Sequence, residues 1–307
     1  MTPLRKALRD YLALRRSVGF KLETAGQLLP KFVDYLHHRR ASRITCELAL
    51  AWAMLPRDKR RWWAVRLSLV RGFARFLHAR EPRTEVPPLD LLPQGRWRAT
   101  PYLYSQTEIS ALVRAARALG PPLLAATYST VIGLLAATGM RRGEVIALDR
   151  QDIDWQQGIL LVRNSKFGKS RELPLHPTTL DALRSYARVR DRLFPRLATK
   201  SFFVSLAGTR LLDHLVHRIF RRLCRAVGIL PRSPLCRPRI HDLRHTFAIR
   251  TMLDWYRSGA DVECKLPLLS TYLGHFDPSS TYWYLSAAPE LLSLAARRLQ
   301  RAWEVRP

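Results

Sequence analysis

The sequence of 307 residues predicts a mainly α-helical protein with two domains and one small antiparallel sheet. Apolar residues recur at helical spacing on both sides of a proline-rich stretch at residues 81–101. Prolines stiffen a chain and end regular structure, so this stretch indicates a linker. Two short apolar segments around a polar turn predict a β-hairpin in the second region. We therefore expect domains at residues 1–85 and 104–307, joined by a linker at 86–103.

Four helices are expected in the first domain, because periodic apolar residues cover residues 4–18, 24–38, 46–54 and 58–78. In the fourth helix the aromatic side chains, among them Trp62 and Phe73, are expected to pack in the core. Its basic side chains are expected to face outward, where they would contact either nucleic-acid phosphates or only water. These basic residues are Lys59, Arg60, Arg66, Arg71 and Arg75.

The second domain is expected to begin with a helix, because Ser105 and Glu108 form the S-x-x-E pattern of a capping box. The uncharged run at residues 120–140 contains prolines and glycines, which favours a buried core helix over a membrane span. GILLV and ELPLH then predict the hairpin strands, with NSKFGKSR as the turn. Further helices are expected over residues 180–194, 213–228, 241–256 and 289–303.

The chain is strongly basic, with a net charge of +28 and a pI of about 11.2. Residues 1–100 hold 21 Lys and Arg against 8 Asp and Glu, and the remainder holds 31 against 16. Charge spread over both domains indicates two surfaces that bind one long polyanion, so nucleic acid is favoured over a ribosomal or membrane-surface role.

Four cysteines occur without a CxxC pair, which argues against a zinc ribbon or a redox motif and indicates reduced thiols in a cytosolic protein. The first residues lack the apolar segment of a signal peptide, which also favours the cytoplasm.

Cleavage and rejoining of a phosphodiester without a metal has definite chemical requirements. Fixed cations must stabilise the charge on the non-bridging oxygens, and an acid must protonate the departing sugar oxygen. A nucleophile that stays covalently attached conserves the bond energy for rejoining. Five motifs in chain order could supply these groups. The candidates are Arg141 with Glu144 in TGMRRGE, Lys166 in the hairpin turn, His241 and Arg244 in HDLRHTFA, His275 in LGH, and Tyr284 nine residues later.

Together these motifs resemble those of the tyrosine recombinase family (phage integrases of the lambda-integrase type) over about residues 104–300. The N-terminal helices are similar in position to that family's helical, SAM-like core-binding domain. The resemblance implies a mostly helical catalytic domain with a small antiparallel sheet, and a C-shaped clamp around duplex DNA. It also implies a reaction that needs neither a metal nor a cofactor.

The resemblance also assigns a role to each candidate. Arg141 and Arg244 would clamp the scissile phosphate, and His241 and His275 would hydrogen-bond it and assist proton transfer. Lys166 would protonate the departing 5′ oxygen, and Tyr284 would form a 3′-phosphotyrosyl bond. Glu144 would orient a guanidinium without touching the phosphate.

Three alternatives stay open at this stage. Tyr282 competes with Tyr284, although two residues apart on a helix they face different directions. Lys169 competes with Lys166 as the acid. If Lys166 is the acid, Lys169 and Arg171 would contact phosphates or solvent. His245 lies four residues after His241, as in a zinc-binding helix. The motif lacks the glutamate of such helices, so we expect His245 to be a structural residue.

The expected function is that of a site-specific DNA recombinase or integrase, carried by a mobile element such as a transposon. A catalytically inactive DNA-binding accessory protein of such an element is the alternative, and a metal-dependent nuclease is disfavoured because clustered carboxylates are lacking. The expected partners are double-stranded DNA, other copies of this chain in dimers and tetramers, and other recombinases of the same element. The C-terminal helix would mediate self-association. The expected location is the bacterial cytoplasm, in association with the nucleoid.

Overall fold

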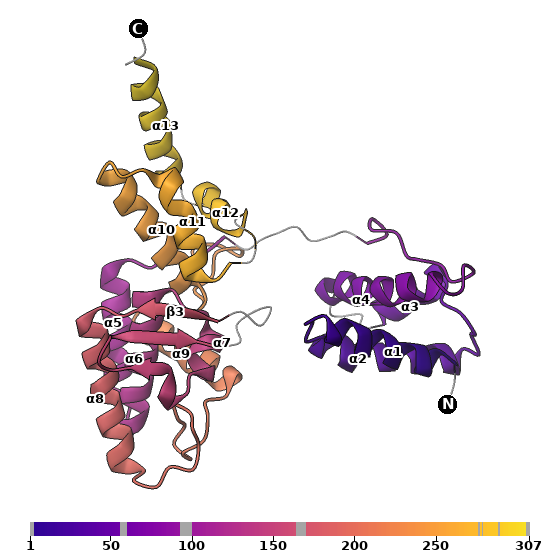
Figure 1. The fold of residues 1–307 in the computed structure, drawn as a ribbon, viewed down its shortest axis with the longest axis horizontal. Helices are drawn as coiled ribbons and strands as arrows, with labels where there is room; N and C mark the ends of the chain where they lie inside the picture. The colour runs from indigo at the N-terminus through magenta and orange to yellow at the C-terminus, as the bar shows by residue number, and fades with distance from the viewer. Residues whose placement is uncertain are drawn as a thin grey trace. The chain divides into compact units, whose positions relative to one another are not determined.

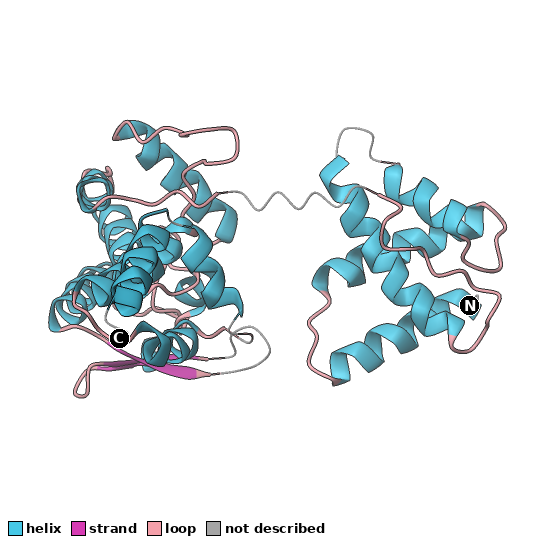
Figure 2. Cartoon of the chain, turned by 90° about the horizontal axis from the view of Figure 1, so that it is seen from above, coloured by secondary structure: helices cyan, strands magenta, loops and turns pink. Residues whose placement is uncertain are grey.

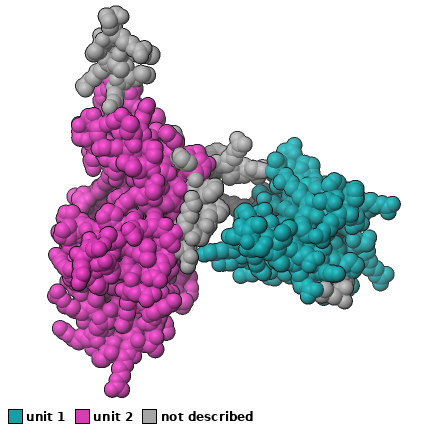
Figure 3. All heavy atoms as spheres, in the orientation of Figure 1, with its two compact units in different colours: residues 1–98 teal, residues 99–307 magenta. Residues whose placement is uncertain are grey.

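The computed structural model describes residues 3–55, 60–92, 100–163, 170–275, 277, 279–287 and 289–304. The chain divides into two compact units, residues 1–98 and 99–307 (Figure 3). Both units are mainly helical, and the strands belong to the second unit (Figures 1 and 2).

Unit 1 contains the four expected helices, which surround one apolar core. They are α1 (Pro3–Ser17), α2 (Glu23–His38), α3 (Cys46–Met54) and α4 (Arg60–His78). The Thr45 hydroxyl caps α3 by accepting a hydrogen bond from the backbone N–H of Leu48 at 3.2 Å. Phe32 and Trp52 pack in the core with ring centroids 5.0 Å apart, and Phe73 is fully buried beside them.

Two expectations for α4 were wrong. Trp62 is 48% exposed, although it lies on the same helix face as buried Phe73, so its position near the end of the helix leaves it outside the core. Arg71 does not face outward: it is 6% exposed and donates hydrogen bonds of 2.6 Å to the carbonyls of Pro87 and Pro88. Backbone carbonyls of the proline-rich stretch thus satisfy this buried cation. Residues 86–92 pack on the helices of unit 1 through these hydrogen bonds to Arg71 and through the side chains of Val86 and Leu92.

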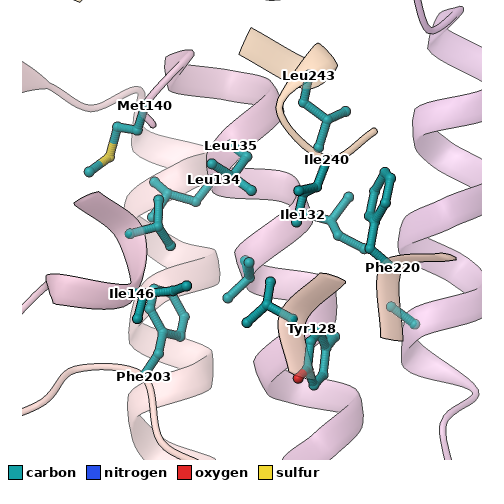
Figure 4. Packing of buried hydrophobic residues seen from close by; sticks show 14 of the residues in the cluster. Tyr128, Ile132, Leu134, Leu135, Met140, Ile146, Phe203, Phe220, Ile240 and Leu243 are labelled. Atoms are coloured by element: carbon teal, nitrogen blue, oxygen red, sulfur yellow. The ribbon is translucent and has the colours of Figure 1, made fainter. Parts of the chain in front are cut away.

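Unit 2 is built around one helix that is apolar on nearly all sides, α6 (Pro122–Thr138). It contacts α5 (Gln106–Arg117), α8 (Pro177–Leu193) and α10 (Asp242–Arg257). The capping box at Ser105 and Glu108 is present at the start of α5, as the sequence predicted. Figure 4 shows the resulting core, where α6 side chains such as Ile132 and Leu135 lie among Phe220, Ile240 and Leu243. No helix in the described part of the chain is long and apolar enough to cross a membrane.

The sheet of unit 2 has three antiparallel strands in the order β1-β2-β3. The predicted hairpin is formed by β2 (Ile159–Val162) and β3 (Arg171–Pro174), in a register that pairs Leu160 with Leu173. The short strand β1 (Ile153–Asp154) was not expected; it follows a 3-10 turn at Arg150–Asp152.

The remaining elements divide unit 2 into two apolar clusters. α7 (Arg142–Ala147) and α9 (Asp213–Ala226) belong to the part around α6. A second cluster is formed by α10 with α11 (Val262–Leu273), α12 (Ser279–Ala287) and α13 (Pro289–Glu304), which lie together at one end of the unit (Figure 1). The candidate site lies where these two clusters meet, because α10 contributes to both.

Candidate active site

The site begins where α6 ends. Gly139 caps the helix in the left-handed conformation (φ 61°), and a Cβ at this position would lie 2.5 Å from a ring carbon of Phe247. Only glycine therefore fits. The turn brings the Gly139 carbonyl to Arg244, whose Nη1 donates to it at 2.8 Å. It also places Arg141 at the first position before α7.

Glu144 holds Arg141 in place. The backbone N–H and the Nη1 group of Arg141 donate to the two carboxylate oxygens of Glu144, each at 2.9 Å. Nη2 of Arg141 donates to the carbonyl of Gly274 at 2.8 Å. The Arg141 side chain keeps 24% of its surface exposed, so part of the guanidinium is accessible to a ligand.

Arg171 binds the opposite side of the same carboxylate, with bonds of 3.0 and 2.8 Å to Glu144. Its Nε donates to the carbonyl of Tyr272 at 2.7 Å, and the side chain is only 11% exposed. The expectation that Arg171 contacts phosphates or solvent is therefore wrong. Burial alone would raise the pKa of Glu144, but the hydrogen bonds and charges of Arg171 and Arg141 lower it below its usual value.

Arg244 is the buried cation of the site. It is 2% exposed, and its Nη2 donates to the carbonyl of Leu273 at 2.7 Å. Burial, and then the charge of Arg141, lower its pKa to about 10, so it stays protonated at neutral pH. Leu273 and Gly274 present adjacent carbonyls to Arg244 and Arg141, and this pair of acceptors brings the two guanidiniums together.

Gly274 ends α11 with φ 67°, and a Cβ here would lie 2.8 Å from Nη1 of Arg171. His275 follows it, and Nδ1 of His275 lies 2.7 Å from the hydroxyl of buried Thr281. Desolvation, and then the nearby Arg244, lower the pKa of His275 to about 4, so its ring is neutral at pH 7.

His241 immediately precedes α10, and it is the exposed histidine of the site. Partial loss of hydration, and then the guanidiniums of Arg244 and Arg239, lower its pKa to about 4. At neutral pH it is therefore uncharged, and it can exchange hydrogen bonds with a ligand at the surface.

Tyr284 on α12 completes the cluster. It is 2% exposed, its ring stacks on that of His275 at a centroid distance of 6.1 Å, and its hydroxyl lies 3.2 Å from Nδ1 of His245. Burial raises the pKa of the phenol, against the opposing effect of Arg244 and Arg141. Tyr282, two residues earlier, is 51% exposed and lies away from this cluster.

His245 is the residue that sequence reasoning missed as part of the site. The one available signal was its place four residues after His241, one turn along the same helix, which we weighed only as a zinc pattern. No group of three or more potential metal ligands occurs among the residues that the structure describes.

Some predicted residues cannot be placed. Lys59, Lys166 and Lys169 lie outside the described residues, as does the side chain of Arg60. On α4, Arg66 is half-buried: its guanidinium lies 3.7 Å over the ring of Trp52 and donates to that residue's carbonyl at 2.6 Å. Arg75 is exposed.

Comparisons with known sequences agree with one another. Residues 104–290 match the model of the phage integrase family. Over 100% of both chains, the sequence is 42% identical to "Putative integrase/recombinase y4rB" of Sinorhizobium fredii. It is 36% identical to y4rE of that organism, which carries the same description, over 96% of this chain and 95% of the relative. It is 28% identical to the tyrosine recombinase XerC of Alcanivorax borkumensis, over 71% and 66% respectively.

Solved structures share the fold at low sequence identity. The Tn1549 transposon integrase in complex with transposon right end DNA aligns with a TM-score of 0.65 and 15% identity, covering 98% of this chain and 99% of that one. The lambda integrase tetramer bound to a Holliday junction aligns with a TM-score of 0.60 and 19% identity, covering 92% and 76%.

Proposed function

This chain belongs to the phage integrase family of tyrosine recombinases, and we propose that it is a site-specific recombinase that cleaves and rejoins DNA through a 3′-phosphotyrosyl intermediate, without a metal. The observation that carries the proposal is the convergence of three side chains from separate parts of the chain. Arg141 and Arg244 donate to adjacent carbonyls, and Tyr284 lies close enough to both for their charges to act on its pKa.

The charges of the site suit a phosphodiester. Two fixed guanidiniums would stabilise the negative charge that builds on the non-bridging oxygens, and the exposed ring of His241 would hydrogen-bond them. His275, whose ring stacks on that of Tyr284, would also hydrogen-bond the phosphate and assist proton transfer. Glu144 and Arg171 would act indirectly, by fixing the orientation of Arg141.

The nucleophile is neutral before the reaction, because burial raises the pKa of Tyr284 above its already high usual value of about 10. The phenol must therefore lose its proton as it attacks the phosphorus. The departing 5′ oxygen needs a proton in turn, and we assign that transfer to Lys166 in the hairpin turn.

A nicked DNA substrate tests this proposal, because the short fragment that leaves after cleavage diffuses away and the covalent complex accumulates. The wild-type chain should become linked to the 3′ phosphate, as seen by denaturing electrophoresis and by mass spectrometry of the modified peptide. Tyr284→Phe should bind DNA with unchanged affinity and form no adduct, and Tyr282→Phe is the matched control that should still form it. A wild-type chain that binds DNA but forms no adduct would support the inactive accessory protein.

We propose that exposed arginines of unit 1 contact DNA phosphates, with Arg75 as the clearest described candidate. Arg75→Ala should weaken DNA binding and reduce the slope of log K against log salt by about one, since each neutralised phosphate contributes about 0.9. Arg71→Ala should instead destabilise unit 1, because Arg71 anchors the proline-rich stretch. An unchanged salt slope for Arg75→Ala would remove this helix from the DNA interface.

We propose that copies of the chain assemble into dimers and tetramers on DNA through α13. Leu291 is fully buried in its own unit, whereas the adjacent Leu292 is 52% exposed and is free to enter another copy. Leu292→Asp should reduce the DNA-induced assembly measured by light scattering and leave binding of one copy intact. Retention of tetramers by this variant would contradict the role of α13.

We further propose that the protein acts on the DNA of a bacterial mobile element, in the cytoplasm at the nucleoid, alone or with other recombinases of that element. The relatives described as integrase/recombinase and the fold shared with a transposon integrase support this setting.

A further inference from the structure

The hydroxyl of Tyr284 interacts with Arg244 and also lies within hydrogen-bonding distance of His245, a residue that the proposed mechanism has not used. Nδ1 of His245 lies 3.2 Å from Tyr284 Oη, and the two rings meet edge to face with centroids 5.4 Å apart. His245 is largely buried on α10, between the rings of His241 and Trp283. A histidine nitrogen in contact with the reacting oxygen is placed to accept its proton.

The opposite side of the ring supports the tautomer that such a role requires. Nε2 of His245 faces Oδ1 of Asp242 at 3.9 Å, and Asp242 is fully buried. Arg239 grips this carboxylate through bonds of 3.0 and 2.7 Å. At 3.9 Å this is a charge contact and not a hydrogen bond. The negative charge near Nε2 favours the proton on that nitrogen, and Nδ1 can then accept the phenol hydrogen.

The other two histidines of the site are engaged differently. His275 has its Nδ1 at the hydroxyl of Thr281, and its ring stacks on that of Tyr284. His241 contacts the ring of His245 edge to face at 4.9 Å and is exposed to an entering ligand. His245 is therefore the histidine whose geometry matches proton transfer from the nucleophile.

We propose that His245 is the general base of the cleavage step, an inference that rests on the proposed recombinase function. The O–H bond of Tyr284 breaks and its proton passes to Nδ1 of His245, while the phenol oxygen bonds to phosphorus. The bond from phosphorus to the 5′ oxygen breaks, and that oxygen takes a proton from the acid assigned to Lys166. Asp242 stabilises the imidazolium that forms. Rejoining runs the same transfers in reverse.

The charges around His245 make this base depend on bound DNA. Burial, and then its cationic neighbours, lower its pKa to about 3, so without DNA it is a weak base. A phosphate anion between Arg141 and Arg244 would offset part of that positive charge and make His245 more basic, only when the substrate is present. Among the residues that the structure describes, six titratable or charged groups face His245. Asp242 and Arg244 belong to α10, and Arg239 and His241 to the loop before it. Tyr284 belongs to α12, and His275 to the loop after α11.

The decisive variant is His245→Asn, whose side-chain oxygen can accept the phenol hydrogen bond but cannot take the proton. Adduct formation on the nicked substrate should slow by about a hundredfold or more, the usual contribution of a general base. Its rate should rise about tenfold per pH unit from pH 6 to 9, because hydroxide then removes the proton, whereas the wild-type rate should level off. His214→Asn, at an exposed histidine of α9, is the matched control.

A second substrate distinguishes the proposed base, His245, from the proposed acid, Lys166. Sulfur in place of the leaving 5′ oxygen departs without protonation, because a thiol has a pKa of about 8.5. With this substrate, adduct formation by Lys166→Ala should return to the wild-type rate, whereas adduct formation by His245→Asn should stay slow. If His245→Asn fails to fold, His245→Phe keeps the ring volume, and the same two results are expected.

Several results would overturn the inference. His245→Asn could react at the wild-type rate, follow a pH profile parallel to the wild type, or recover on the sulfur substrate. The proposed function fails separately, if the wild type forms no adduct or if Tyr284→Phe still forms one.

Discussion

Charged hydrogen bonds hold the arginine side of the site (Arg141, Glu144, Arg171 and Arg244), whereas apolar packing holds the tyrosine side (α12 and α13). On the arginine side, the guanidiniums of Arg141, Arg171 and Arg244 each donate to at least two acceptors, of which at least one lies on a distant segment of the chain. On the tyrosine side, Tyr284 lies in an apolar cluster with buried residues such as Leu269 and Leu291, and its hydroxyl is 3.2 Å from Nδ1 of His245. Charged bonds fix direction, and apolar packing does not. The comparison indicates that hydrogen bonds fix Arg141 and Arg244 before any ligand arrives, whereas changes in packing can move Tyr284.

The largest effect is expected on the arginine side. Glu144→Gln keeps the shape of the side chain but leaves Arg141 and Arg171 without their shared anion. Removal of one partner from a buried ion pair costs about 3–5 kcal/mol. Urea unfolding of the full chain, followed by fluorescence, should show a loss of this size in the free energy of unfolding. Asp181→Asn, at an exposed ion pair with Arg184, is the control and should change it little. A loss below about 1 kcal/mol for Glu144→Gln would contradict the charged-clamp description.

Gly274 joins the two sides, and its substitution should have an intermediate effect. Alanine there would adopt φ 67° and press against the Arg171 guanidinium, at a cost of roughly 1–3 kcal/mol. It would also shift the carbonyl that Arg141 uses, so adduct formation should fall along with thermal stability. Gly143→Ala is the matched control, because its Cβ would meet nothing within 4 Å. Equal melting temperatures for the two variants would show that the Gly274 turn can relax.

A smaller effect is expected on the tyrosine side. Thr281→Val keeps the shape but removes the hydroxyl that contacts His275, which should lower the free energy of unfolding by about 1 kcal/mol. Adduct formation should slow more than stability alone explains, because His275 would lose its orientation against Tyr284. The cleavage rate per folded, DNA-bound chain measures this. An unchanged rate per bound chain would show that Thr281 acts only through stability.

The three histidines of the site also predict a dependence of stability on pH. His241, His245 and His275 have pKa values lowered to about 4, 3 and 4, while the unfolded chain binds protons near pH 6.5. The unfolded state therefore takes up protons first, and stability that is full above pH 6.5 should decline as the pH falls toward 4. Urea unfolding at pH 7.5 and 5.5 tests this, and His245→Asn should flatten part of the decline. Equal stability at both pH values would contradict the lowered pKa values.

Much of the fold follows from local patterns in the sequence. The capping box at Ser105 begins α5, and the two short apolar segments form β2 and β3 in the expected order. The sequence could not reveal the partners of Arg71 and Arg171, because they lie far along the chain: Pro87 is 16 residues from Arg71, and Tyr272 is 101 residues from Arg171. His245 was missed for the same reason, since Tyr284 is 39 residues away.

Local patterns along the chain indicate most of the helices, although not α11 or α12, as well as the apolar segments and the order in which chemically capable residues occur. Capping and periodicity act over a few residues, so these features are readable along the chain. Which cations stay accessible to a ligand and which are used internally is visible in three dimensions alone. Arg141 keeps an accessible surface, whereas Arg71 and Arg171 are bound to carbonyls and a carboxylate. Electrostatic and hydrogen-bonding energies depend on distance in space, and folding sets those distances.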